Sequence, residues 1–128
     1  MVSMMRNDTR SSNHGIYARC ANLTVQLLFR GKWHVHILCA MRHGPVRIGQ
    51  LGRLLPGASK KVLTQSLRQM EARGLIVRTD MSDAVLHVEY ELQKDLGGSV
   101  EALLDELATW GARFLTLESE RKRMDSTE

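Results

Sequence analysis

This sequence of 128 residues has little cysteine and no long hydrophobic run. Two cysteines are too few for a disulfide framework and fit a reducing compartment. No apolar stretch approaches the roughly 20 residues that a membrane-spanning helix needs. The polar opening, residues 1–15, also lacks the apolar segment of a secretory signal. We therefore expect a cytoplasmic protein without membrane contact, whose residues 1–15 form a disordered arm.

The sequence also lacks the motifs that carry common enzyme chemistry. It has no glycine-rich phosphate loop, no serine nucleophile elbow and no zinc-hydrolase helix. His36, Cys39 and His43 are ligand types that suit zinc, and they recur at i, i+3 and i+7. However, no fourth ligand is apparent and the spacing matches no established zinc motif. The sequence therefore predicts no enzyme activity, no metal site and no cofactor.

Charge is distributed unevenly along the chain, whose formal net charge is +4. Residues 30–80 hold ten Lys or Arg and only two acidic residues, whereas residues 81–117 carry a net charge of −5. A concentrated basic block is typical of a nucleic-acid-binding face, because neutralised phosphates release their condensed counterions. We expect the basic half to contact nucleic acid and the acidic half to remain away from it.

The hydrophobic pattern between Val46 and Leu92 predicts a winged helix-turn-helix. A short strand precedes two short helices, and Pro56 and Gly57 form the turn between them. Gly74 can end the second helix in a left-handed conformation, and a two-stranded hairpin, the wing, follows. The expected elements are residues 46–48, 48–55, 59–73, 76–79 and 86–92.

The second of these helices has two chemically different faces. Leu63, Leu67 and Met70 form an apolar stripe that packs inward. Cations on the opposite face suit phosphate oxygens, and an amide suits an adenine edge. An ordinary solvated helix face is the alternative. The predicted DNA-contacting residues are Arg53, Lys60 and Lys61 for phosphates, Thr64, Gln65 and Arg68 for bases, Ser59 as the helix cap, Arg47, and Arg78 on the wing.

Helices are also expected on both sides of this unit, at 22–30, 33–41 and 100–117. The last has an apolar face wider than so small a domain can cover, which favours a homodimer over a helix that folds back on its own domain. Such a dimer would place two recognition helices about 34 Å apart, one turn of duplex DNA. The domain is then 16–117 and the flexible tail 118–128. The expected interface residues are Leu23, Leu27, Leu103, Leu107, Trp110 and Phe114.

Five segments between Cys20 and Leu115 resemble the signatures of HxlR-type transcription regulators. The resemblance implies a mainly helical α+β fold, a winged helix-turn-helix of the MarR/HxlR kind with flanking dimerisation helices. It also implies a homodimer that binds double-stranded DNA and represses or activates nearby genes. Cys20 is followed by Ala21, where members usually carry Cys-Pro. The segments are Gly31-Lys32-Trp33, Gly44-Pro45-Val46-Arg47-Ile48, Leu54 to Thr64, Leu67 to Ile76 and Val88 to Leu92.

The resemblance makes Cys20 a candidate redox sensor, because several oxidant-responsive members keep their sensor thiol at this position. At a helix N-terminus the dipole would favour the reactive thiolate, and the alternative is a cysteine that merely packs. A small molecule is the other candidate effector, with Trp33 and His34 lining a pocket near the dimer interface. A winged-helix adaptor that binds an acidic protein, without sequence-specific DNA binding, remains the alternative to a repressor.

Overall fold

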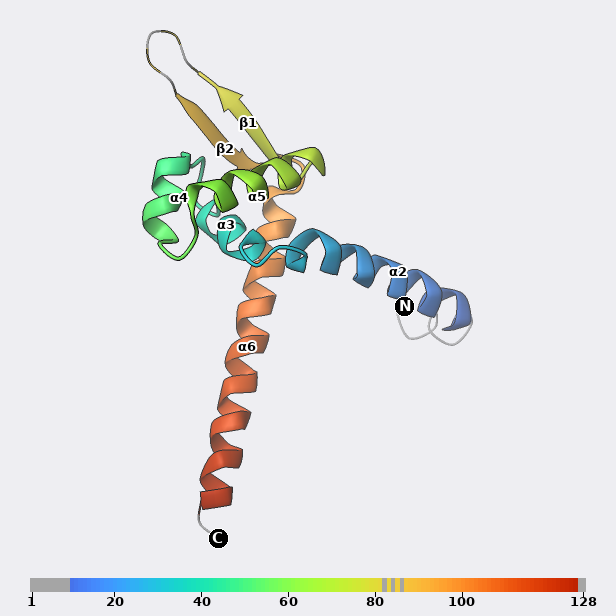
Figure 1. Cartoon of the computed structure of the whole chain (residues 1–128). Coiled ribbons are helices and arrows are strands. Elements are labelled where there is room, and N and C mark those ends of the chain that lie inside the picture. Colours follow the sequence, from blue (N-terminus) through green and yellow to red (C-terminus); the bar gives the residue numbers. More distant parts are fainter. Residues whose placement is uncertain (1–9, 82, 84, 86, 127–128) are drawn as a thin grey trace.

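The computed structural model describes residues 10–81, 83, 85 and 87–126. Its described part is mainly helical and has one two-stranded antiparallel sheet (Figure 1). This is the winged helix-turn-helix architecture that the sequence predicts. The elements are α2 (Arg10–Phe29), α3 (His34–Ala40), α4 (Ile48–Leu54), α5 (Lys60–Ala72), β1 (Ile76–Asp80), β2 (Val88–Leu92) and α6 (Gly97–Ser126).

The body of the molecule is built around α3, which contacts α2, α4 and α6. Helix α3 contributes Ile37 and Leu38 to the core, and α5 contributes the predicted stripe of Leu63, Leu67 and Met70. All five side chains are fully buried. Because the buried stripe fixes the rotation of α5, the opposite face of this helix is turned outward.

The wing is the hairpin of β1 and β2, which pairs Ile76 with Leu92 and Arg78 with Tyr90. The strand expected at 46–48 is reduced to one bridge, in which the backbone N–H and C=O of Val46 both bond to Tyr90 at 2.8 Å. Helix α4 begins at once at Ile48, which leaves no room for a longer strand. The bridge ties the wing to the helix-turn-helix.

Helix α2 begins much earlier than the expected residue 22. Residues 10–15, expected in the disordered arm, form its first turns, while residues 1–9 lie outside the described residues. The chain has no proline between Arg10 and Phe29, and Gly15 costs a helix only about 1 kcal/mol. The flanking helix is therefore longer than the leucine pattern alone indicates.

Helix α6 likewise continues to Ser126, so residues 118–126 are helical where we expected a flexible tail. These residues include neither glycine nor proline, and Glu118 lies 3.9 Å from Lys122 in an i, i+4 pair. The whole helix is about 45 Å long at 1.5 Å per residue. Its apolar segment and its charged end thus form one continuous rod.

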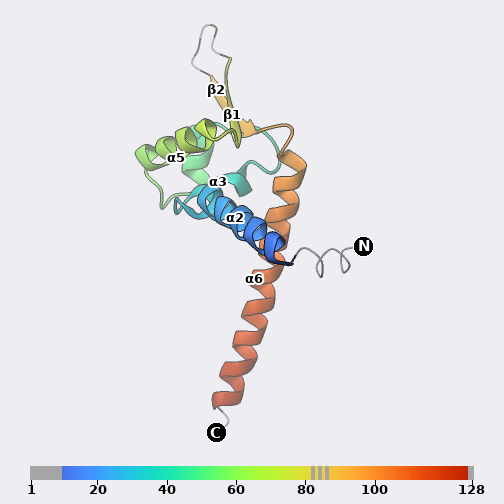
Figure 2. The same cartoon turned by 90° about the vertical axis from the view of Figure 1, so that its right-hand side faces the viewer.

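The long helices leave the body in different directions (Figures 1 and 2). Helix α6 extends away from the wing, and only its beginning packs on α3, where Val100 and Leu104 are buried and Arg42 lies 3.5 Å from Asp105. The alternative in which this helix folds back on its own domain is therefore not observed. In the part of the chain that is described, no helix combines the length and apolarity needed to cross a bilayer.

Candidate nucleic-acid interface

Helix α5 begins with the cap that the sequence predicts. The Ser59 hydroxyl oxygen accepts a hydrogen bond from the Val62 backbone N–H at 3.2 Å. A serine cap contributes about 1 kcal/mol to helix stability. The turn before it is close-packed, because a side chain at Gly57 would lie 3.2 Å from the Trp33 ring. Ser59 is thus placed at the helix start mainly as a cap.

The outward face of α5 has the predicted composition. Five side chains of this helix surround one open hollow, and none of them is acidic. In the described ranges, no carboxylate pairs with the three cations among them. Unpaired cations at a helix surface remain available for phosphate oxygens. The five residues are Lys60, Lys61, Thr64, Gln65 and Arg68.

A second hollow of about 460 Å³ lies between α4, the start of α5 and the wing. Four cations from different parts of the sequence line it, and its lining also includes Tyr90 and Val88 of β2. No acidic side chain lines it. We call this hollow the wing groove, and it brings together Arg47, Arg53, Lys60 and Arg78.

Arg47 is held in place by a short chain of polar contacts that the sequence did not reveal. Its guanidinium donates to Nδ1 of His87, and Nε2 of His87 donates to Glu89 at 2.9 Å. The backbone N–H of Arg47 donates to Oε1 of Gln50 at 2.8 Å, which caps α4. His87 directly precedes β2 and Glu89 lies on it, and residues two apart in an extended chain share a face. Arg47, however, lies 40 residues before His87.

The structure corrects the prediction that places Cys20 at a helix N-terminus. Cys20 lies in the middle of α2 and is exposed. The influence of a helix dipole is confined to the terminal turns, so the dipole does not activate this thiol. What the structure shows in favour of a reactive Cys20 is the exposure of its thiol.

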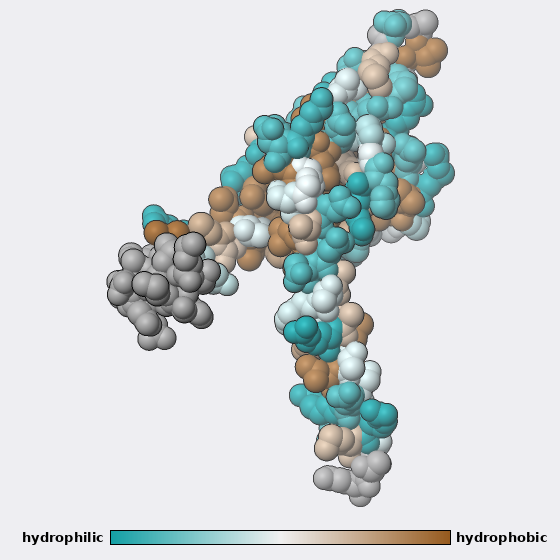
Figure 3. Space-filling view, turned by 180° about the vertical axis from the view of Figure 1, so that it is seen from behind, coloured by the Kyte–Doolittle hydropathy of each residue, from teal (hydrophilic) through white to brown (hydrophobic). Residues whose placement is uncertain are grey.

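The expected interface residues form an apolar surface on the two protruding helices. Leu23, Leu103, Trp110 and Phe114 are exposed, whereas Leu27 and Leu107 are half-buried against the core. The rings of Trp110 and Phe114 stack with centroids 5.6 Å apart. Figure 3 shows hydrophobic residues where α2 leaves the body and again along α6.

The residues considered as zinc ligands do not share one helix, because α3 ends at Ala40 and His43 follows it. Among residues 10–126, with 82, 84 and 86 set aside, no three His, Cys, Asp or Glu side chains gather closely enough for a metal ion. His34 does line a cavity, as expected, whereas Trp33 lies elsewhere, beside His36 and Gly57.

Comparison with known proteins gives one consistent result. The family model for the HxlR-like helix-turn-helix matches residues 28–119. The HTH-type transcriptional regulator YtcD of Bacillus subtilis (strain 168) is 45% identical over 85 residues, which cover 66% of this chain and 67% of YtcD. Residues 28–119, which the family model matches, include every cation of the outward α5 face and of the wing groove. Cys20 lies outside this range.

Two solved structures are similar as well. A MarR-family transcriptional regulator from Enterococcus faecalis V583 has a TM-score of 0.71 at 31% identity and covers 80% of this chain and 92% of its own. The redox regulator HypR in its reduced form has a TM-score of 0.70 at 28% identity and covers 77% of this chain and 97% of its own. Both support the winged-helix architecture.

Proposed function

Since this chain belongs to the HxlR-like helix-turn-helix family and is a DNA-binding transcription regulator, we propose that it acts as a cytoplasmic homodimer on an inverted-repeat operator, as a repressor. The observation that carries the proposal is the basic surface made of the outward α5 face and the adjoining wing groove, neither of which is lined by an acidic side chain. An enzyme would need a catalytic constellation, whereas this surface offers cations and an amide to a polyanion.

The geometry supports a division of roles within this surface. With α5 in the major groove, Thr64, Gln65 and Arg68 face base edges. Lys60 lies in both hollows, so it can contact the phosphates between the two parts of the surface. Arg78 lines the same wing groove, and we assign it to the DNA backbone or the adjacent minor groove. The remaining phosphate contacts are assigned to Arg47, Arg53 and Lys61.

The exposed apolar faces of α2 and α6 support the dimer. In a monomer, Trp110 and Phe114 would both be exposed to water. Together they form a larger apolar patch than single exposed hydrophobic residues do. A second copy offers the same patch, and a two-fold interface is self-complementary. Pairing through these helices would carry two α5 helices to successive major grooves, about 34 Å apart.

The proposal is tested by measuring how tightly the protein binds the promoter region of its own gene. Fluorescence anisotropy across a series of salt concentrations gives this affinity. The parent protein should bind an inverted repeat tightly, with a log–log salt slope that grows by about 0.9 per neutralised phosphate. Arg68→Ala should weaken this binding by about 1–3 kcal/mol while changing non-specific binding little, because Arg68 reads a base.

Arg121→Ala is the matched control, since Arg121 is exposed near the far end of α6. It should keep the parent affinity for both DNAs. Weak, sequence-blind association with a shallow salt slope would instead favour an adaptor that uses the basic surface to meet an acidic protein.

We propose in addition that Cys20 senses oxidants, which the similarity to a protein named as a redox regulator and the exposure of the thiol support. Cys39 is also exposed and free, so it provides a matched control. Peroxide should change the operator affinity of the parent and of Cys39→Ser, and it should leave Cys20→Ser unchanged. An equal response of both variants in the anisotropy assay would eliminate the role of Cys20.

A further inference from the structure

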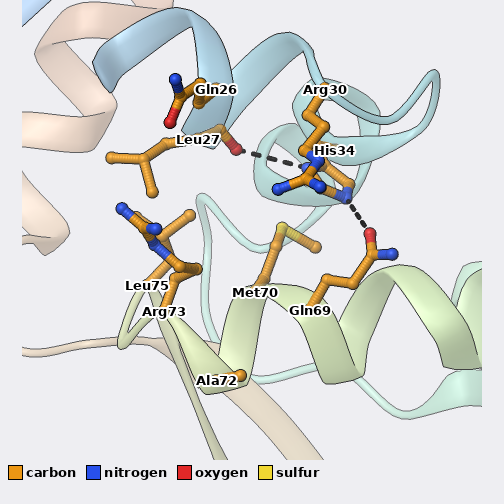
Figure 4. A pocket seen from close by; sticks show the side chains of 9 residues that line it. All are labelled: Gln26, Leu27, Arg30, His34, Gln69, Met70, Ala72, Arg73 and Leu75. Carbon is orange, nitrogen blue, oxygen red and sulfur yellow. Dashed lines mark hydrogen bonds between the residues drawn. The ribbon is translucent and has the colours of Figure 1, made fainter.

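A cavity of about 250 Å³ lies between the end of α2, the start of α3 and the C-terminal end of α5 (Figure 4). It is separate from the outward α5 face and from the wing groove, because its lining shares no residue with either. Leu27, Met70 and Leu75 supply its apolar lining. We call it the α2–α5 pocket.

Two guanidinium groups face this pocket from opposite sides. Arg30 descends from the end of α2 and Arg73 rises from the end of α5 (Figure 4). No acidic residue lines the pocket, and neither arginine side chain bonds to a carboxylate anywhere in the described part of the chain. Gln26 and Gln69 add amide groups. The pocket is therefore positive, with its charge unbalanced by the protein.

A buried histidine connects the two helices inside this pocket. His34 is only 4% exposed, its Nδ1–H donates to the Leu27 carbonyl at 3.3 Å, and its Nε2 lies 3.2 Å from Oε1 of Gln69. Gly31 leaves the space that the ring occupies, since a Cβ at Gly31 would lie 2.7 Å from Nε2. The His34 ring thus forms a polar bridge between α2, α3 and α5 at the wall of the pocket.

We propose that the α2–α5 pocket binds a small organic carboxylate with an apolar body about the size of one ring. Arginine pairs with carboxylates through strong, charge-assisted hydrogen bonds, and the three apolar side chains provide contact for the body. The volume suits a small ligand, because a cavity of roughly 150 Å³ already holds benzene and pockets for larger ligands start near 300 Å³.

Occupancy of this pocket is coupled to DNA binding, a step that rests on the proposed function. One wall belongs to α2, which carries part of the proposed dimer surface, and the other belongs to the end of α5. A carboxylate held by Arg30 and Arg73 fixes these two helices relative to each other. The ligand then favours one placement of the recognition helices over another, which is what a change in operator affinity requires.

Calorimetric titration of the full chain without DNA tests the site. Benzoate should bind, its neutral isostere benzamide should bind at least tenfold more weakly, and inorganic phosphate should bind more weakly than benzoate for lack of an apolar body. Arg30→Gln and Arg73→Gln should each weaken benzoate binding at least tenfold, while Arg121→Gln keeps it. Thermal unfolding confirms that each variant is folded.

Absence of benzoate binding, equal binding of benzoate and benzamide, or unchanged binding in both pocket variants would overturn the site. Coupling is tested separately by measuring operator affinity with and without saturating benzoate, and a change of at least threefold is expected. An unchanged affinity would overturn the coupling and leave the site standing. If the protein bound no DNA, the proposed function would fail, while the calorimetry would still decide the site.

Discussion

Replacing Trp110 and Phe114 together by glutamate should leave the chain monomeric and weaken its binding to an inverted-repeat operator by about a hundredfold or more, because linked half-site contacts gain that much from avidity. Trp110 is 65% exposed, Phe114 is 51% exposed, and both lie beyond the buried start of α6. The substitutions therefore place charge in the proposed interface without entering the core.

Sedimentation velocity would report the oligomeric state, and anisotropy would report affinity for the full operator and for a single half-site. Half-site affinity should stay near that of the parent, since α5 is untouched. Ala108→Glu with Ala112→Glu is the matched control, because both alanines are exposed and lie on the opposite side of α6. Persistence of dimers in the Trp110 and Phe114 variant would contradict the proposed interface.

The sequence predicts α5 well because everything that defines it is local. The Ser59 cap, the stripe of Leu63, Leu67 and Met70 and the terminating Gly74 all lie within one helix length, and each is confirmed. Gly74 has a φ of +80°, the left-handed conformation that glycine adopts easily. One face of the candidate interface follows directly from this pattern.

The features that the sequence did not reveal depend on contacts between distant segments. His34 and Gln69 are 35 residues apart, and Arg47 and His87 are 40 residues apart. No periodicity relates such pairs, because their proximity is set by the packing of whole helices and of the wing. The residues that join His34 in lining the α2–α5 pocket, and the anchoring of Arg47, therefore emerge only from the tertiary structure.

The lengths of α2 and α6 were underestimated for a different reason. The hydrophobic pattern marks only the part of a helix that packs against something. Residues 118–126 carry charged side chains and no apolar stripe, yet they continue the helix. Intrinsic propensity and i, i+4 pairs such as Glu118 with Lys122 sustain it there. Helix ends on polar segments are accordingly hard to place from periodicity.

Replacing Leu67 by alanine should lower the free energy of unfolding by about 2–5 kcal/mol, the cost of emptying a fully buried leucine site. Leu67 is 0% exposed and belongs to the hydrophobic core to which α2, α3, α4, α5, β1 and α6 all contribute buried side chains. A small domain has only about 5–15 kcal/mol of stability in total, so this loss would bring it close to the unfolding threshold. Urea unfolding followed by circular dichroism, at one fixed protein concentration, would measure it.

Val62→Ala on the same helix is the control, since Val62 is 37% exposed, and it should cost less than about 1 kcal/mol of unfolding free energy.

Comparing Leu67→Ala with Arg68→Ala, a substitution at the next residue, separates effects on stability from effects on base recognition. Folded Leu67→Ala should retain the base preference of the parent, because its outward side chains are unchanged. Arg68→Ala should retain stability and lose that preference. If both variants lost base preference while folded, the two faces of α5 would not be independent, and the division between packing and recognition would fail.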